Sequence, residues 1–390
     1  MVSFAVIPAI LSALLAQDAQ IRRDGAYWER TESSTVNEVP ARLLKITTRG
    51  HVVIRGSAAE RITYRLTERV RARSEEEAHR LFHSNISTAI NRNGMTTLVF
   101  MPMAHESVLT QLDVHVPNRV AGVIVDAQPG DVEVYDVDGS VHVDTTAGLI
   151  RCDRVGGSVE GRTGGGEIHL GKIGGAVQCV SAAGSIIVDN AGGQANCQTA
   201  GGEIQIREAA GPVTLSTEGG NIQVDRCAAS VQAHTREGVI QVLQAGGMVF
   251  ADTRGGSIEV GSARGVQCQS AAGAIRVKTS TGPLRVQTAL GSILAELLSG
   301  ARIEDSSLVA GSGDITVMIP SNLALSVMAR NDTGANPRIV SDFSEVRAQA
   351  QARTIGFNRP PLVYEGSING GGPLLSLNTA GGIIYVRKLK

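Results

Sequence analysis

Hydrophobic and polar positions alternate in a sequence motif that repeats every eighteen residues between Gly130 and Gly300. Each copy opens on a glycine, and apolar side chains follow two and four residues later. This alternation predicts a strand with one buried face, and a short fixed period with glycine punctuation predicts a solenoid. The spacing slips once, to seventeen residues. The opening glycines are Gly130, Gly148, Gly166, Gly184, Gly202, Gly220, Gly238, Gly256, Gly273 and Gly291.

The repeat also has a half-period, because a second glycine follows most of the first ones after nine residues. A weaker apolar alternation comes after it, as in Val141/Val143 and Leu284/Val286. Each coil therefore consists of two strands and two turns, and successive coils stack as parallel strands about 4.8 Å apart. The predicted fold class is all-β, a parallel β-solenoid or β-helix of about ten such 18-residue coils.

A hydroxyl side chain stands three residues before each opening glycine from Gly148 to Gly291. Stacked hydroxyls can bond along the coils and to the backbone of the turns, so we predict a structural ladder. The functional alternative is a flat threonine array that binds ice or sugar. The ladder residues are Thr145, Thr163, Ser181, Thr199, Thr217, Thr235 and Thr253, continued by Ser270 and Thr288.

All five cysteines lie in the repeats, and Cys179 and Cys197 are eighteen residues apart at the same strand position. We expect these two to form a stacked pair on adjacent coils. Stacked positions are slightly too far apart for an ideal disulfide, so the alternatives are a strained bridge and small buried apolar side chains. No spacing of cysteine and histidine here is typical of a zinc site.

The segments that flank the repeats are predicted to be caps, because the ends of a solenoid expose unpaired strand edges and an open core. Strands are expected at 42–48 and 51–55, joined by a turn at Gly50. Ser74 and Glu77 form a capping box that opens an amphipathic helix, which we expect to end near Ser87. The N-terminal cap is thus strand-rich with one helix.

After Gly300 the period breaks, continues through Gly313–Val317, and returns in Gly372–Gly382 with Ile384 and Val386 at the inward positions. The intervening excursion is expected to cover the last coil. The predicted segments are a signal peptide at 1–19, the N-terminal cap at 20–125, solenoid repeats at 126–318, the capping excursion at 319–371, and a final coil with a basic tail at 372–390.

Composition and charge narrow the function classes. Lys and Arg number 36 against 37 Asp and Glu, which argues against a nucleic-acid partner, because such a protein needs a basic face. The apolar run Phe4–Ala16 is too short to span a bilayer and fits the core of a signal peptide, with cleavage after Ala16 or Ala19. No basic residue precedes it. We expect export to the periplasm or cell surface, and no membrane span.

A search for catalytic chemistry finds scattered groups, so we predict no catalytic, cofactor-binding or metal-binding residues and no enzyme. Asp153, Asp189 and Asp225 recur on alternate coils, about 10 Å apart, too far for two of them to share one calcium ion. No nucleophile elbow, phosphate loop or metal motif is present in the sequence.

The repeated pattern G-G-x-I-x-V…G-x-V-x-x-x-T, followed by GSGDITV at 311–317 and GGGP at 370–373, resembles the bacterial "putative adhesin" family of β-solenoid domains of unknown function. The resemblance covers roughly 40–390. It implies placement at the surface or in the periplasm and an adhesive or scaffolding role, and it transfers no catalytic residues.

The leading hypothesis is a non-enzymatic, exported, adhesin-like or envelope scaffold module. The alternative is a carbohydrate-binding or carbohydrate-active β-helix. The sequence does not identify the partner of the protein, and the candidates are an envelope polysaccharide or another surface protein. An enzyme should show a groove across neighbouring coils with convergent carboxylates or basic groups, whereas a scaffold should show flat faces of mixed polarity.

Overall fold

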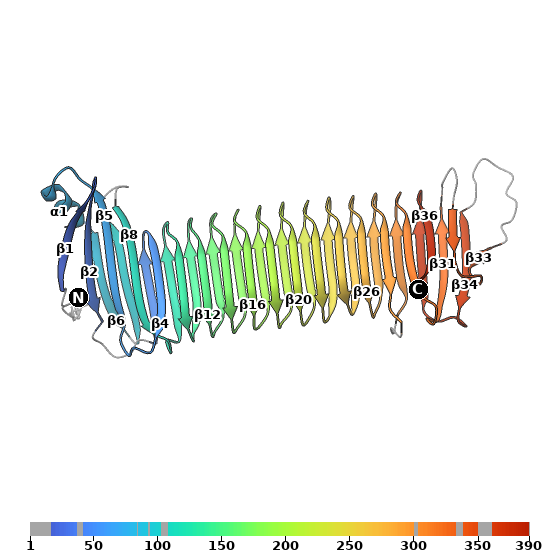
Figure 1. Cartoon of the computed structure of the whole chain (residues 1–390), viewed down its shortest axis with the longest axis horizontal. Helices are drawn as coiled ribbons and strands as arrows, with labels where there is room; N and C mark the ends of the chain where they lie inside the picture. The colour runs from blue at the N-terminus through green and yellow to red at the C-terminus, as the bar shows by residue number, and fades with distance from the viewer. Residues whose placement is uncertain are drawn as a thin grey trace, which may run out of the picture. The chain divides into compact units, whose positions relative to one another are not determined.

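The computed structural model describes residues 17–36, 42–83, 85–92, 94–102, 108–299, 303–332, 338–349 and 361–389. Its contacts divide the chain into two units, 1–176 and 177–390. Within each unit, successive strands of the repeats alternate between two parallel sheets, which we call sheet A and sheet B. The described residues are nearly all β, with one helix, which confirms the predicted parallel β-solenoid (Figure 1).

Unit 1 combines antiparallel and parallel pairing in sheet A. The antiparallel part is the series β1–β2–β5–β8, and β8 then pairs in parallel with β4, the first coil strand in sheet A. The parallel part continues through β10, β12 and β14. The strands are β1 Gln17–Asp24, β2 Tyr27–Thr35, β4 His51–Ser57, β5 Thr63–Arg71, β8 Val108–Pro117, β10 Val132–Val137, β12 Ile150–Val155 and β14 Ile168–Ile173.

Sheet B of unit 1 starts with the antiparallel pair β6–β7, and all later pairings are parallel. Its strands, in sheet order, are β6 Asn85–Arg92, β7 Met95–Pro102, β3 Leu43–Thr48, β9 Gly122–Ala127, β11 Ser140–Thr145 and β13 Val159–Thr163.

The coils begin earlier in the chain than the glycine repeat, which starts at Gly130, indicates. Strands β3 and β4 lie in different sheets, in register with β9 and β10, so the turn at Gly50 is a coil corner rather than a hairpin. Gly50 has a φ of 114°, a region that favours glycine. The stack therefore starts before residue 126, because an insertion at 58–121 separates the first coil from the second and hides the period.

Helix α1 (Glu75–His83) is shorter than expected, because strand β6 starts at Asn85 and pairs with β7. The predicted capping box of the helix is present, since the Glu77 amide donates to Ser74 Oγ at 3.2 Å and the Arg73 amide donates to the Glu77 carboxylate at 2.7 Å. Phe82 and Ala78 of the helix pack against Val70 of β5. The predicted signal peptide lies outside the described residues up to residue 16. Cleavage after Ala16 would leave β1 whole.

Unit 2 contains the most regular coils. Sheet A has β16 Ile186–Ala191, β18 Ile204–Ala209, β20 Ile222–Cys227, β22 Ile240–Ala245, β24 Ile258–Ala263, β26 Ile275–Ser280, β28 Ile293–Leu297, β30 Ile315–Pro320, β36 Ile383–Leu389 and β32 Arg338–Ser341. Sheet B has β15 Val177–Ser181, β17 Ala195–Thr199, β19 Val213–Thr217, β21 Val231–Thr235, β23 Met248–Thr253, β25 Gly265–Ser270, β27 Leu284–Thr288, β29 Ser306–Ala310, β35 Leu374–Thr379, β31 Leu325–Asn331, β34 Leu362–Ile368 and β33 Arg347–Ala348.

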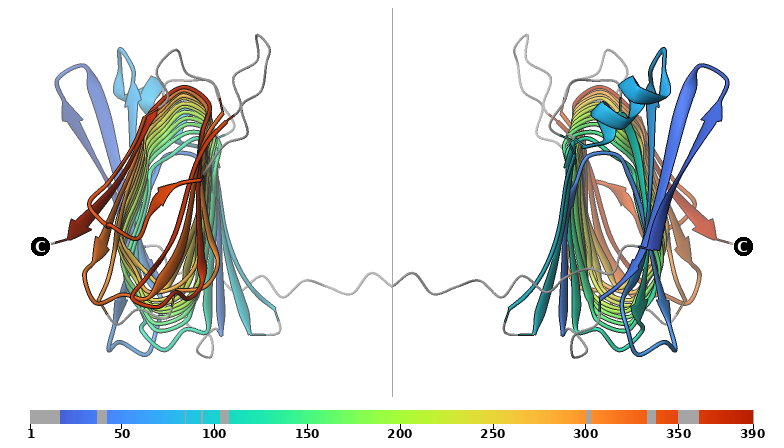
Figure 2. Two further views of the ribbon diagram at one scale, coloured as in Figure 1. Left: turned by 90° about the vertical axis from the view of Figure 1, so that its right-hand side faces the viewer. Right: turned by 90° about the vertical axis from the view of Figure 1, so that its left-hand side faces the viewer.

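The core of unit 2 lies between its two sheets, which face each other across a narrow interior (Figure 2). The isoleucines that open the strands of sheet A stack on one another in register from Ile204 to Ile293 and are fully buried. A third inward position, which the alternation did not predict, closes the corner with a small side chain such as Ala209 or Ala245. The thin interior explains why aromatic residues are only 3% of the chain.

The single slip in the period falls in the corner between β24 and β25. Ile240 still pairs with Ile258, whereas Val249 pairs with Val266, seventeen residues later. The corner therefore loses one residue while both sheets keep their register, so the inward face of every strand is preserved.

The chain does not end its coils in sequence order. Strands β35 and β36 return from the excursion and stack directly on β29 and β30. Strands β31 and β32, which precede them in the sequence, pair with their outer edges, and the antiparallel pairs β31–β34 and β34–β33 follow. The excursion thus covers the edges of the returning coil.

Candidate functional site

The predicted hydroxyl ladder lies at the buried end of the strands of sheet B. The hydroxyls do not bond to one another. Each threonine Oγ1 donates to the carbonyl of the opening glycine fifteen residues earlier, at the neighbouring corner, and many also accept the amide of the opening glycine three residues later. Thr217, for example, donates to Gly202 O at 3.0 Å and accepts from Gly220 N at 3.2 Å. The column therefore fastens neighbouring corners and offers no exposed binding array.

We expect Thr217→Val to lower the free energy of unfolding by about 2 kcal/mol, because a buried carbonyl and a buried amide both lose their partner. Thr217 is 2% exposed, and valine has nearly the same shape. The matched control is Thr214→Val on the exposed face of the same strand, which should change stability by less than about 0.5 kcal/mol. Urea unfolding followed by circular dichroism measures both, and equal effects would contradict the ladder's role.

The predicted cysteine pair is in register on adjacent strands, with Cys179 beside Cys197. All five cysteines are buried thiols. Burial raises the pKa of Cys152 and of Cys268 to about 12, so neither is a thiolate at neutral pH. The thiols of this chain therefore act as small apolar core residues.

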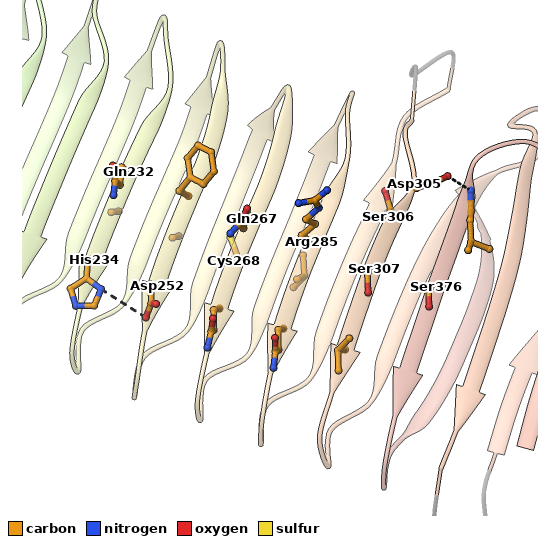
Figure 3. A pocket seen from close by; sticks show the side chains of 18 residues that line it. Gln232, His234, Asp252, Gln267, Cys268, Arg285, Asp305, Ser306, Ser307 and Ser376 are labelled. Carbon is orange, nitrogen blue, oxygen red and sulfur yellow. Dashed lines mark hydrogen bonds and ion pairs between the residues drawn. The ribbon is translucent and has the colours of Figure 1, made fainter. Parts of the chain in front are cut away.

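A groove of about 690 Å³ lies on the outer face of sheet B in unit 2. It crosses six neighbouring strands, β21, β23, β25, β27, β29 and β35 (Figure 3). Its outward side chains form two columns that run from strand to strand. The first column is Gln232, Phe250, Gln267, Arg285, Ser307 and Ser376, and the second is His234, Asp252, Gln269, Gln287 and Val309.

Four glutamine amides line the groove. Gln232, Gln267, Gln269 and Gln287 each present both a donor and an acceptor, so the surface can bond hydroxyl groups in either sense. Phe250 lies between Gln232 and Gln267 and is 40% exposed, which is unusual for a large apolar side chain on a polar sheet. The small side chains of Ser307 and Ser376 lower the floor beyond them.

Among the residues that line the groove, Arg285 is the one Lys or Arg. Its neighbours on the adjacent strands, Gln267 and Ser307, are uncharged. No described residue forms an ion pair with its guanidinium. Other exposed arginines of the repeats do have a partner within the chain, such as Arg207, which pairs with Asp189 at 3.0 Å, and Arg236, which pairs with Glu218 at 2.9 Å.

The two carboxylates of the groove already have partners within the chain. His234 Nδ1 lies 3.8 Å from Asp252 Oδ1, and Asp305 Oδ1 accepts the amide of Leu374 at 2.8 Å (Figure 3). These residues lie toward opposite ends of the groove, so they form no carboxylate pair around a bond to be cleaved. Cys268 is buried and protonated. The lining residues therefore favour binding over covalent or acid–base catalysis.

A second polar cluster, on sheet A of unit 1, is neutralised internally. The guanidinium groups of Arg55 and Arg154 lie 5.9 Å and 6.0 Å from the Tyr135 ring centroid. Arg55 pairs with Asp113 at 3.5 Å, and Arg154 holds the pKa of Asp136 below its usual range by a hydrogen bond of 2.5 Å. Because its charges are matched, this cluster offers less to a ligand than the groove does.

Sequence reasoning did not find the groove, because it followed the outward residues of the first strand of each coil and not those of the second. A usable signal was present, since Phe250 and Arg285 interrupt a column of amides and small polar residues at the repeat spacing. Its concavity could not be seen, because Ser307 and Ser376 are far apart in sequence and neighbours only through the returning strand β35.

Among the described residues, no group of three His, Cys, Asp or Glu side chains is arranged to hold a metal ion. The described part of the chain also has no helix that is long and apolar enough to cross a membrane.

Comparison with known proteins gives little guidance. No protein-family model and no curated protein matches the chain. A "putative cell adhesion protein" from Clostridium sporogenes is 8% identical over 93% of this chain and 100% of its own, with a TM-score of 0.20. A "putative adhesin" from Bacteroides fragilis is 10% identical over 92% of this chain and 97% of its own, with a TM-score of 0.23.

Proposed function

We propose that the protein is a non-enzymatic, adhesin-like binding module of the cell envelope, and that the groove on sheet B of unit 2 is its binding surface. The observation that carries this proposal is the groove itself: about 690 Å³ across six strands, lined by amides, an exposed phenylalanine and an unpaired arginine. These are groups that recognise a ligand, and they lack the nucleophile–base or acid–base geometry of an enzyme.

Export is part of the proposal and rests on the sequence. The apolar run Phe4–Ala16 fits the core of a signal peptide, and the repeat motif resembles a family that is named for adhesion. A rigid stack of coils with a buried core is suited to such a role, because it holds its outward side chains at fixed spacing.

Carbohydrate binding is the second candidate function, and Phe250 favours it. An exposed aromatic ring flanked by glutamine amides can contact the apolar face of a sugar ring while the amides bond its hydroxyls. A protein partner would be expected to use a larger apolar centre than this groove offers.

The test is an array of glycans, envelope polymers and surface proteins probed with the full-length protein, with mass spectrometry of every bound species. We expect binding without a change in ligand mass. Phe250→Ser and Gln267→Ala should each weaken binding, whereas Gln223→Ala on the outer face of sheet A should not. A cleaved product would overturn the non-enzymatic assignment, and binding that is insensitive to the groove variants would place the surface elsewhere.

A further inference from the structure

We propose that the ligand of the groove is a linear acidic polysaccharide, with one sugar carboxylate bound by Arg285 and another sugar ring of the same polymer, about one disaccharide unit away, packed on Phe250. This inference rests on the proposed binding function and adds the chemical class of the ligand.

The charge of the groove supports an anionic ligand. Arg285 stands between the uncharged side chains of Gln267 and Ser307 and has no ion-pair partner among the described residues. A guanidinium is the side chain best suited to bind a carboxylate through two parallel hydrogen bonds. The partner that the chain does not supply is therefore an anion with planar geometry, which matches a uronic acid.

The exposed ring of Phe250 supports a sugar rather than a free organic anion. Its side chain remains 40% exposed, although the inward positions of the same strand, Val249 and Ala251, are fully or almost fully buried. Covering such a ring with the apolar face of a pyranose removes apolar surface from water without leaving a polar group unpaired. A small acid has no face of this kind.

The spacing of the two groups supports a polymer. Phe250 and Arg285 lie in one column with Gln267 between them, so two strand spacings, about 10 Å, separate them. This is about the length of a disaccharide unit in an extended chain. Gln267 in the same column, with Gln269 and Gln287 in the next, would bond the hydroxyls of the sugars in between.

The acidic side chains of the groove are compatible with this ligand. Asp252 faces His234 at 3.8 Å, and Asp305 accepts the Leu374 amide at the far end. Neither forms an ion pair with Arg285. Because Asp252 and Asp305 lie toward opposite ends of the groove and are already engaged within the chain, a sugar carboxylate can meet Arg285 between them while sugar hydroxyls meet the ends.

The experiment compares two polymers with the same backbone, polygalacturonate and its fully methyl-esterified form, by calorimetric titration of the full-length protein. We expect polygalacturonate to bind at least about tenfold more tightly, since a charge-assisted pair contributes about 1.5–3 kcal/mol. Arg285→Gln should weaken binding of the acid form by about tenfold and leave the ester form unchanged. Phe250→Ser should weaken both.

Arg276→Gln is the matched control, because Arg276 is an exposed arginine on the outer face of sheet A, away from the groove. It should change neither affinity. Equal affinity for acid and ester, or equal effects of Arg285→Gln and Arg276→Gln, would overturn the acidic-glycan assignment. Binding of a surface protein at the groove, with no binding of either polymer, would also overturn it and would leave the proposed binding function standing. If none of the groove variants weakens the binding of any ligand, the proposed function is overturned as well.

Discussion

Gly220→Ala is expected to lower the free energy of unfolding by about 3 kcal/mol or more, although it adds only one methyl group. A Cβ at this position would lie 1.9 Å from the carbonyl oxygen of Gly202 and 2.5 Å from its carbonyl carbon. Both atoms belong to the backbone of the preceding coil, so no side chain can move aside. The corner must open, and the hydrogen bonds of Thr217 that fasten it would lengthen or break.

The adjacent glycine is the matched control. An added Cβ at Gly219 meets nothing within 4 Å. Gly219→Ala should therefore be neutral or stabilise by about 0.4–1 kcal/mol, because it restricts the unfolded chain. Urea unfolding measures both variants, and hydrogen exchange shows whether protection is lost at the corners around Gly202 and Gly220. If the two variants have the same stability within about 0.5 kcal/mol, close approach is not what requires glycine at this position.

Arg30→Ala is expected to lower the stability of unit 1 by about 3–5 kcal/mol, because it removes a guanidinium that pairs with a buried carboxylate. The Glu68 side chain is 2% exposed, and its Oε2 accepts from Arg30 Nε at 2.8 Å and Nη2 at 2.5 Å. The Arg30 guanidinium also lies 5.1 Å from the centroid of the Phe82 ring of α1. The substitution should therefore loosen α1 as well as the strands β2 and β5 that carry the pair.

A double variant separates the charge from the packing. Replacing both partners, Arg30→Met with Glu68→Leu, should recover most of the stability, because no unpaired charge remains. Arg162→Ala is the exposed control, since Arg162 pairs with Glu160 at 2.5 Å but is half exposed, and it should cost less than about 1 kcal/mol. Urea unfolding measures the stability of the three variants, and limited proteolysis shows whether α1 has loosened in each of them. Equal losses for Arg30→Ala and Arg162→Ala would show that burial of Glu68 is not decisive.

Both predictions concern how neighbouring coils or strands are held together, and the groove depends on the same rigidity. Its side chains come from six strands that are fixed in register by parallel pairing. A change that opens a corner of unit 2 should therefore also weaken ligand binding, although no groove residue is altered.

The sequence by itself determined the period, the two strands of each coil, the inward positions and the hydroxyl column. Each of these follows from interactions that every coil repeats. Burial of one face fixes a two-residue alternation, and a corner where backbones nearly touch admits only glycine. The isoleucine column from Ile204 to Ile293 and the bonds of Thr217 lie where that pattern predicts them.

Only the tertiary structure decided where the coils begin, the order in which they end and where the chain is hollowed. Strands β3 and β4 join the stack across an insertion, and β35 inserts between β29 and β31, so contacts there link residues without a fixed spacing. The groove was equally hidden, because burial does not constrain outward residues. Its shape and charge depend on which side chains, such as Phe250, Arg285 and Ser376, are brought to neighbouring strands by pairing over long distances in the chain.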